Sequence, residues 1–122
     1  MNKTERIVAD FKSSLVQFLD ELIETFPSNQ DFIMMRVLIK DQIPITVIMD
    51  SFVEDVDSLR RKVDTRDESF FTEYNPIFAK LGKEQTFQAA WSSIRHDKEN
   101  TDVMWRWISK LVRLAENYKS CV

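Results

Sequence analysis

Covalent catalysis needs a nucleophile, a base and an orienting group within mutual reach, and this sequence offers few such residues. Its one histidine, His96, lies in a charged stretch beside Asp97, and its one cysteine, Cys121, lies next to the last residue. No G-x-S-x-G turn occurs, and the single glycine, Gly82, excludes the glycine-rich loops that cradle phosphates. His96 is interpreted as a surface residue and Cys121 as a tail residue. We therefore predict no catalytic residues and no enzyme activity.

Acidic side chains at helical spacing form the second group that could do chemistry. Asp50, Glu54 and Asp57 follow steps of four and three residues, which places them on one face of a helix. A solvated face is the usual meaning of such a pattern, because a metal site needs a second set of ligands opposite the first. Asp20 and Glu24 could supply that set, so a carboxylate–metal enzyme is kept as an alternative. The prediction is that the chain binds no metal and no cofactor.

Basic residues alternate with tryptophan near the end of the sequence, a pattern that can grip a nucleic-acid backbone and stack a base. Arg106, Lys110 and Arg113 recur at helical spacing, and Trp105 lies near their face by angle, away from Trp107. The candidate surface for nucleic acid or for a partner comprises Arg95, Trp105, Arg106, Lys110 and Arg113. The favoured alternative is a solvated amphipathic helix, with Trp107 in the core and Trp105 as a partly covered edge.

The formal net charge of −3 is unevenly distributed along the sequence. Residues 1–74 contain nine Lys and Arg and fifteen Asp and Glu, whereas residues 75–122 contain eight and five. The first part is therefore acidic and the second basic, and the folded surface has two electrostatic sides unless folding mixes them. An acidic chain without a dense basic run argues against nucleic acid as the main partner.

Several apolar residues lie beside the stripes that a core requires. The candidate protein interface comprises Phe70, Phe71, Val103 and Val112. A contiguous apolar cluster on a surface is typical of an interface, whereas single exposed apolar residues need no explanation. We expect a protein partner or self-association, and no small-molecule substrate.

The elements that position these residues are predicted to be helices, because one glycine and three prolines are too few turn-forming residues for many β-hairpins. Apolar residues at steps of three and four predict an all-α fold, a compact bundle of four long helices with two or three short helical pieces. Gly82 is expected as the left-handed cap of one short piece. The expected helical ranges are 4–26, 29–40, 44–63, 65–74, 76–81, 83–94 and 100–119.

Three local details accompany these helices. Ser28 with Asp31, and Thr65 with Glu68, have the spacing of capping boxes. Segment 32–39 is apolar almost all round, which predicts a helix in the middle of the bundle, with a buried strand as the alternative. Asp41 lies between two apolar segments and is expected either as a buried cap of the next helix or as an exposed turn residue.

The length of 122 residues is that of one domain, predicted to span 1–122 with an ordered core over about 4–119. The sequence has no run of about 18 apolar residues, so no membrane span is expected. Its start, rich in charged residues, does not resemble a signal peptide. A lone cysteine suits a reducing compartment, and we expect an intracellular protein.

Several motifs without chemical specificity occur together over about residues 11–119. They are FLDELIE at 18–24, FP at 26–27, LIKDQIPI at 38–45, DESFF at 67–71, WRWI at 105–108 and LAENY at 114–118. In these motifs the chain resembles small uncharacterised helical proteins of the large, nucleocytoplasmic double-stranded DNA viruses of eukaryotes. The resemblance implies no assigned activity. It implies expression in an infected host cell, in the cytoplasm, nucleus or virion, as a virion component or as an assembly or regulatory factor.

The expected function is a non-enzymatic viral protein-interaction module, either homo-oligomeric or docked on a larger partner. The alternative is a nucleic-acid-binding accessory protein that uses the basic last helix. Self-association and the size of any apolar surface patch distinguish the first reading, whereas salt-sensitive binding of DNA distinguishes the second.

Overall fold

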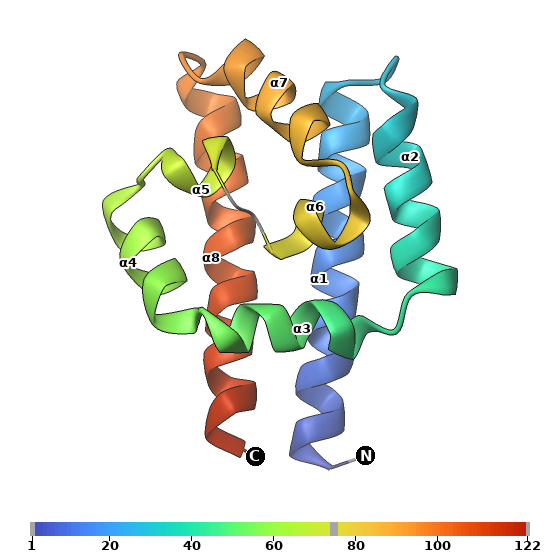
Figure 1. Ribbon diagram of the computed structural model, residues 1–122, viewed down its shortest axis with the longest axis vertical. Helices are drawn as coiled ribbons and strands as arrows, with labels where there is room; N and C mark the ends of the chain where they lie inside the picture. Colours follow the sequence, from blue (N-terminus) through green and yellow to red (C-terminus); the bar gives the residue numbers. More distant parts are fainter. Residues whose placement is uncertain (1, 74–75, 122) are drawn as a thin grey trace.

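Two long antiparallel helices form the centre of the fold (Figure 1). The computed structural model describes residues 2–73 and 76–121, apart from the side chains of 76–78. The long helices are α1 (Lys3–Thr25) and α8 (Lys98–Cys121), and the start of α1 lies beside the end of α8. The elements between them are α2 (Gln30–Val37), a π-helical segment (Leu38–Gln42), α3 (Ile45–Glu54), α4 (Val56–Thr65), α5 (Ser69–Thr72), α6 (Pro76–Leu81) and α7 (Glu84–Ile94).

The secondary structure of the described residues is entirely helical, which confirms the predicted all-α class. The bundle of four long helices is not seen. Only α1 and α8 are long, with 23 and 24 residues, and the α-helices between them have 4 to 11 residues. In Figure 1, α3 crosses both long helices, α2 lies beside α1, and α7 lies across one end of the pair.

Helix α1 forms where the sequence predicts it, within one residue at each end. The side chain of Asn2 accepts a hydrogen bond of 2.8 Å from the backbone N–H of Glu5, so it caps the first turn. The buried face then follows steps of three and four residues along the helix. Pro27 lies just beyond the C-terminal end and prevents continuation. The buried residues of this face are Ile7, Phe11, Ser14, Leu15, Phe18, Leu19 and Leu22.

The predicted helix 44–63 is two helices. Asp55 has φ −113° and ψ 19°, which is outside the helical region, and it separates α3 from α4. The apolar steps continue across this break from Phe52 to Val56 and Leu59, which is why the sequence indicates one uninterrupted helix. The bend allows α3 to cover both α1 and α8 while α4 continues along α8.

Helix α2 lies at the edge of the molecule, and the expectation that it occupies the middle is wrong (Figure 1). Its side chains Phe32 and Met35 are buried, in contact with the side of α1. The opposite side, including Ile33 and Met34, is exposed. A helix that is apolar all round usually has neighbours on every side. In the fold, α2 has its main partner, α1, on one side only.

The chain uses other caps than the two predicted capping boxes. The side chain of Asn29, not that of Ser28, accepts a hydrogen bond of 3.0 Å from the N–H of Asp31 at the start of α2. After α4, Arg66 adopts a left-handed conformation with φ 50° and closes the helix. Asp67 then accepts from the N–H of Ser69 at 2.9 Å.

Two further expectations on caps have opposite outcomes. Gly82 has φ +67° after α6, which confirms the predicted left-handed cap. Asp41 is exposed, so the buried cap is wrong and the expected exposure is confirmed, although the residue lies in the π-helical segment and not in a turn. Helix α3 begins after Pro44 without a side-chain cap. Pro44 has no N–H of its own to satisfy, and it presets the backbone before a helix.

One apolar core joins the helices, and its densest part is aromatic. Phe71 of α5 stacks on Trp91 of α7 with ring centroids 4.0 Å apart, and it meets Trp105 of α8 edge-on at 4.7 Å. Such offset-stacked and edge-on pairs stabilise beyond the area that they bury. We call this group the Phe71 cluster; it comprises Phe70, Phe71, Phe87, Trp91 and Trp105.

Candidate functional site

Three of the four residues predicted as a protein interface belong to the core. Phe70, Phe71 and Val112 are fully or almost fully buried, so none of them is accessible to a partner in this fold. The interpretation as an interface is corrected, because α5 folds back onto α7 and α8 and covers both phenylalanines. Val103 alone is partly exposed, and it lines a pocket described below.

The two tryptophans of α8 have exchanged their expected places. Trp105 is only 5% exposed and belongs to the Phe71 cluster, so it cannot stack on a nucleic-acid base. Trp107, which was expected in the core, is partly exposed at the rim. Helix α8 packs against α1, α3 and α4, so its buried surface is wider than one stripe and includes Trp105. Trp107 is partly exposed because a pocket lined by residues of α1 and α8 opens beside it.

Arg95, at the end of α7, is already engaged in a structural contact. Its guanidinium lies 2.9 Å from one carboxylate oxygen of Glu68, and the indole N–H of the buried Trp91 donates to the other oxygen at 3.0 Å. Glu68 therefore satisfies a buried indole N–H and an arginine at once. Arg95 is not among the residues that line the pocket beside the cations of α8, described below.

The other three predicted cations form one stripe on α8, as their spacing indicates. Arg106 and Arg113 are exposed and Lys110 is partly exposed. The ammonium group of Lys110 lies 5.4 Å from the centre of the Trp107 ring, within the range of a cation–π contact. Across residues 2–73 and 76–121, none of the three is in an ion pair.

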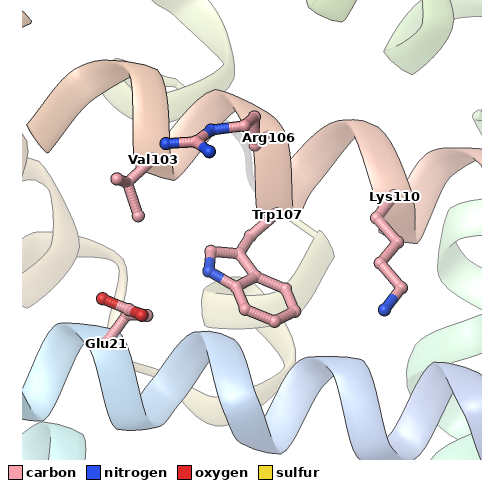
Figure 2. A pocket seen from close by; sticks show the side chains of 5 residues that line it. All are labelled: Glu21, Val103, Arg106, Trp107 and Lys110. Atoms are coloured by element: carbon pink, nitrogen blue, oxygen red, sulfur yellow. The ribbon is translucent and has the colours of Figure 1, made fainter. Parts of the chain in front are cut away.

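A pocket of about 330 Å³ opens between α1 and α8 beside this stripe. Figure 2 shows the indole of Trp107 directed from α8 toward α1, with Lys110 on one side of it and Val103 and Arg106 on the other. The side chain of Glu21 points toward the same space from α1. We call this the α1–α8 pocket; it is lined by Glu21, Val103, Arg106, Trp107 and Lys110.

A second open surface lies on α2 and was not predicted from the sequence. Ile33, Met34 and Val37 are 44%, 54% and 47% exposed, and with Gln30 they line a shallow hollow of about 450 Å³. The four residues recur at steps of three, one and three, so they form one stripe of the helix. The signal in the sequence is the all-round apolar character of 32–39, a pattern that predicts burial equally well. We call Gln30, Ile33, Met34 and Val37 the α2 face.

Ion pairs connect the acidic and the basic parts of the chain. Asp31 of α2 accepts from the hydroxyl of Thr86 at 2.7 Å and pairs with Lys83 at 3.3 Å, and these contacts hold the pKa of that carboxyl below its usual value. Arg66 pairs with Asp102 and lowers its pKa in the same way. The charges of the two parts are thus interleaved at these places, as in the alternative that folding mixes them.

Acidic groups at helical spacing do not converge. In the part of the chain that the structure describes, no three His, Cys, Asp or Glu side chains are arranged to hold a metal ion. Asp50, Glu54 and Asp57 are all exposed. Among residues 2–73 and 76–121, no helix is long and apolar enough to cross a bilayer.

No family model matches the chain, and neither a curated protein nor a solved structure matches it. The resemblance to viral helical proteins stays a prediction from the sequence motifs.

Proposed function

We propose that this chain is a non-enzymatic protein-interaction module whose α2 face pairs with the α2 face of a second copy. The observation that carries the proposal is the exposure of Ile33, Met34 and Val37 side by side on one short helix. Large apolar side chains that share a stripe and face water are typical of contact surfaces, whereas single exposed ones are ordinary.

The α2 face contains no charged residue, and this favours a second copy over other occupants. In a contact with two-fold symmetry the same patch meets itself, so any charge in its centre would meet a like charge. An uncharged apolar stripe avoids this repulsion. A different partner protein would gain specificity from complementary charges, and the α2 face offers none.

The size of the face sets the expected strength of the contact. Stable interfaces bury about 800 Å² on each partner, which is far more than one side of an eight-residue helix supplies. We therefore expect a weak dimer whose population depends on protein concentration. Because each copy carries a net charge of −3, added salt should screen the repulsion between copies and strengthen the dimer.

The test is the molar mass of the full chain by light scattering over a concentration series, for the wild type and for Met34→Glu. The wild type should approach twice the chain mass at high concentration, and Met34→Glu should stay monomeric. Val47→Glu is the matched control, since Val47 is 44% exposed on α3 and lies outside the α2 face. It should dimerise like the wild type.

A charge-pairing experiment separates loss of contact from loss of folding. Met34→Glu and Met34→Lys should each be monomeric, and their mixture should form a heterodimer, because opposite charges then meet across the two-fold axis. A wild type that is monomeric at every concentration would overturn the proposal. So would a dimer that Met34→Glu leaves intact.

Only the sequence motifs support a proposal about the biological setting of this chain. The resemblance to helical proteins of large DNA viruses leads us to propose that the dimer serves assembly or regulation in an infected cell. Recovery of the chain in purified virions, or with an assembly intermediate from infected cells, is the expected outcome. Absence of the chain from virions and from assembly intermediates would overturn the viral part of the proposal.

A further inference from the structure

We infer that the α1–α8 pocket binds one nucleotide unit, with the base against Trp107 and the phosphate on Arg106 and Lys110. This site is on other helices than the α2 face and does not depend on the proposed dimer. It assigns the chain a ligand, which is bound and not converted.

The indole of Trp107 supplies a platform for the base. It is partly exposed, and Figure 2 shows it directed into the space between α8 and α1. The pocket volume of about 330 Å³ lies at the small end of the range for ligand sites, a size that suits a single base better than a larger ligand. Aromatic side chains at such positions stack bases of any sequence. Val103, on the same wall, adds an apolar contact.

Arg106 and Lys110 supply the phosphate contacts. They lie one turn apart on α8 and line the pocket from opposite sides of the Trp107 indole, so both side chains must turn toward the same phosphate when a nucleotide binds (Figure 2). Within the described residues neither is in an ion pair, in contrast to Arg66 and Arg95, although the charge of Arg106 helps to lower the pKa of Asp102, one turn before it on α8. Lys110 now rests near the Trp107 ring at 5.4 Å, and we expect it to exchange this weak cation–π contact for an ion pair with phosphate.

Glu21 gives the site a preference among bases. An ionised carboxylate is an acceptor only, and it binds best where two N–H donors lie side by side. Guanine presents such a pair on its Watson–Crick edge, cytosine and adenine present one amino group each, and thymine presents two oxygens around a single N–H. Because Glu21 faces the pocket from α1, the expected order is guanine first and thymine last.

The charge around the pocket limits the ligand to a short one. The net charge of the chain is −3, and Glu24 is exposed on α1 one turn after Glu21, which itself lines the pocket. A long polyphosphate track would meet these acids, whereas one phosphate can be held on the α8 side. Arg113, the next cation of the stripe, could hold one further phosphate. A free nucleotide and a single strand both contain the required unit.

The first experiment titrates the full chain with guanosine monophosphate and follows the three tryptophan indole signals by NMR. The signal of Trp107 should move, while those of the buried Trp91 and Trp105 should stay. Replacing both cations, in Arg106→Gln with Lys110→Gln, should weaken binding about tenfold or more, in line with two lost phosphate contacts. The matched control is Arg61→Gln, an exposed arginine of α4 that should change nothing.

The second experiment measures fluorescein-labelled ten-nucleotide strands, one rich in guanine and one of thymine only, by anisotropy at several salt concentrations. The logarithm of affinity should fall with the logarithm of salt at about −0.7 per phosphate contacted. Strand binding without binding of the free nucleotide assigns the site to nucleic acid, and equal binding of both assigns it to a nucleotide; either supports the inference.

Glu21→Gln keeps the size of the side chain and supplies a decisive result. It should abolish the preference for guanine over thymine while leaving salt-dependent binding in place. The inference is overturned if neither the nucleotide nor either strand binds at low salt. It is also overturned if binding moves the Trp107 signal no more than those of Trp91 and Trp105, or if Arg61→Gln weakens binding as much as the double variant does.

Discussion

Glutamate, tryptophan and arginine come together at two places in this molecule, one closed and one open. At the closed place, Glu68 accepts from the indole N–H of Trp91 at 3.0 Å and pairs with Arg95 at 2.9 Å. At the open place, Glu21, Trp107 and Arg106 surround the α1–α8 pocket. Within the described part of the chain, neither Glu21 nor Arg106 is in an ion pair.

The difference teaches that residue type alone does not separate stability from binding. The carboxylate of Glu68 is committed to two donors and holds α5 against α7, so it has little capacity left for a ligand. The carboxylate of Glu21, facing the pocket, keeps its acceptor capacity. Both groups have the same composition, and only the geometry of the helices decides which one can bind.

The largest expected effect comes from the two tryptophans of α8. Trp105→Ala removes a buried ring from the Phe71 cluster and should lower the free energy of unfolding by about 3–5 kcal/mol. Trp107→Ala removes a ring at the rim and should cost about 1 kcal/mol. Denaturant unfolding of both variants measures the two losses in free energy of unfolding. Equal losses would break the comparison, because Trp107 would then be as structural as Trp105.

A smaller effect is expected from the two glutamates. Glu68→Gln takes an acceptor and a charge from Arg95 and should cost about 1 kcal/mol, since the pair is partly exposed. Glu21→Gln should leave the free energy of unfolding within about 0.5 kcal/mol of the wild type. Urea midpoints of the two variants give the answer. A loss of stability for Glu21→Gln as large as that for Glu68→Gln would show that Glu21, at the α1–α8 pocket, is committed to structural contacts as Glu68 is.

The smallest effect concerns pH and the contact of Asp102 with Arg66, one turn before Arg106 on α8. The hydrogen bond from Arg66 lowers the pKa of Asp102 in the folded chain. A lowered pKa adds stability above the unfolded value of about 3.9, and this stability is lost as pH falls through the folded pKa. Asp102→Asn should therefore be less stable than the wild type at pH 7, with a difference that disappears in strong acid.

Urea midpoints at neutral pH and at successively lower pH test this sign, because the difference should shrink as the carboxylate of Asp102 takes up a proton. Asp20→Asn is the comparison variant in these urea measurements, because Asp20 forms an exposed ion pair with Arg36 on the other side of α1. A difference for Asp102→Asn that grows as pH falls would contradict the assigned contact.

The sequence predicted the long helices well, because their apolar steps repeat over many turns and Pro27 stops the first of them. Gly82 was also predicted, since no other residue takes its conformation so readily. The break at Asp55 was not, because Phe52, Val56 and Leu59 keep helical register across it and no proline or glycine marks it.

The open surfaces were harder to predict than the helices. A pattern of apolar residues says which side chains avoid water in general, but it does not say how many sides of a helix have a neighbour. This is why α2 was expected inside, and why Trp105 and Trp107 were interchanged. The stripe of Arg106, Lys110 and Arg113 was predicted correctly, since charged side chains leave the core whichever helices surround it.

The central claim is that this chain acts through contacts of the α2 face, and a dilution series followed by NMR tests it most directly. The backbone signals of Ile33, Met34 and Val37 should move as protein concentration falls, while the indole signals of Trp91 and Trp105 should keep their positions. Signals of the α2 face that do not change with concentration, or changes confined to another helix, would contradict the claim.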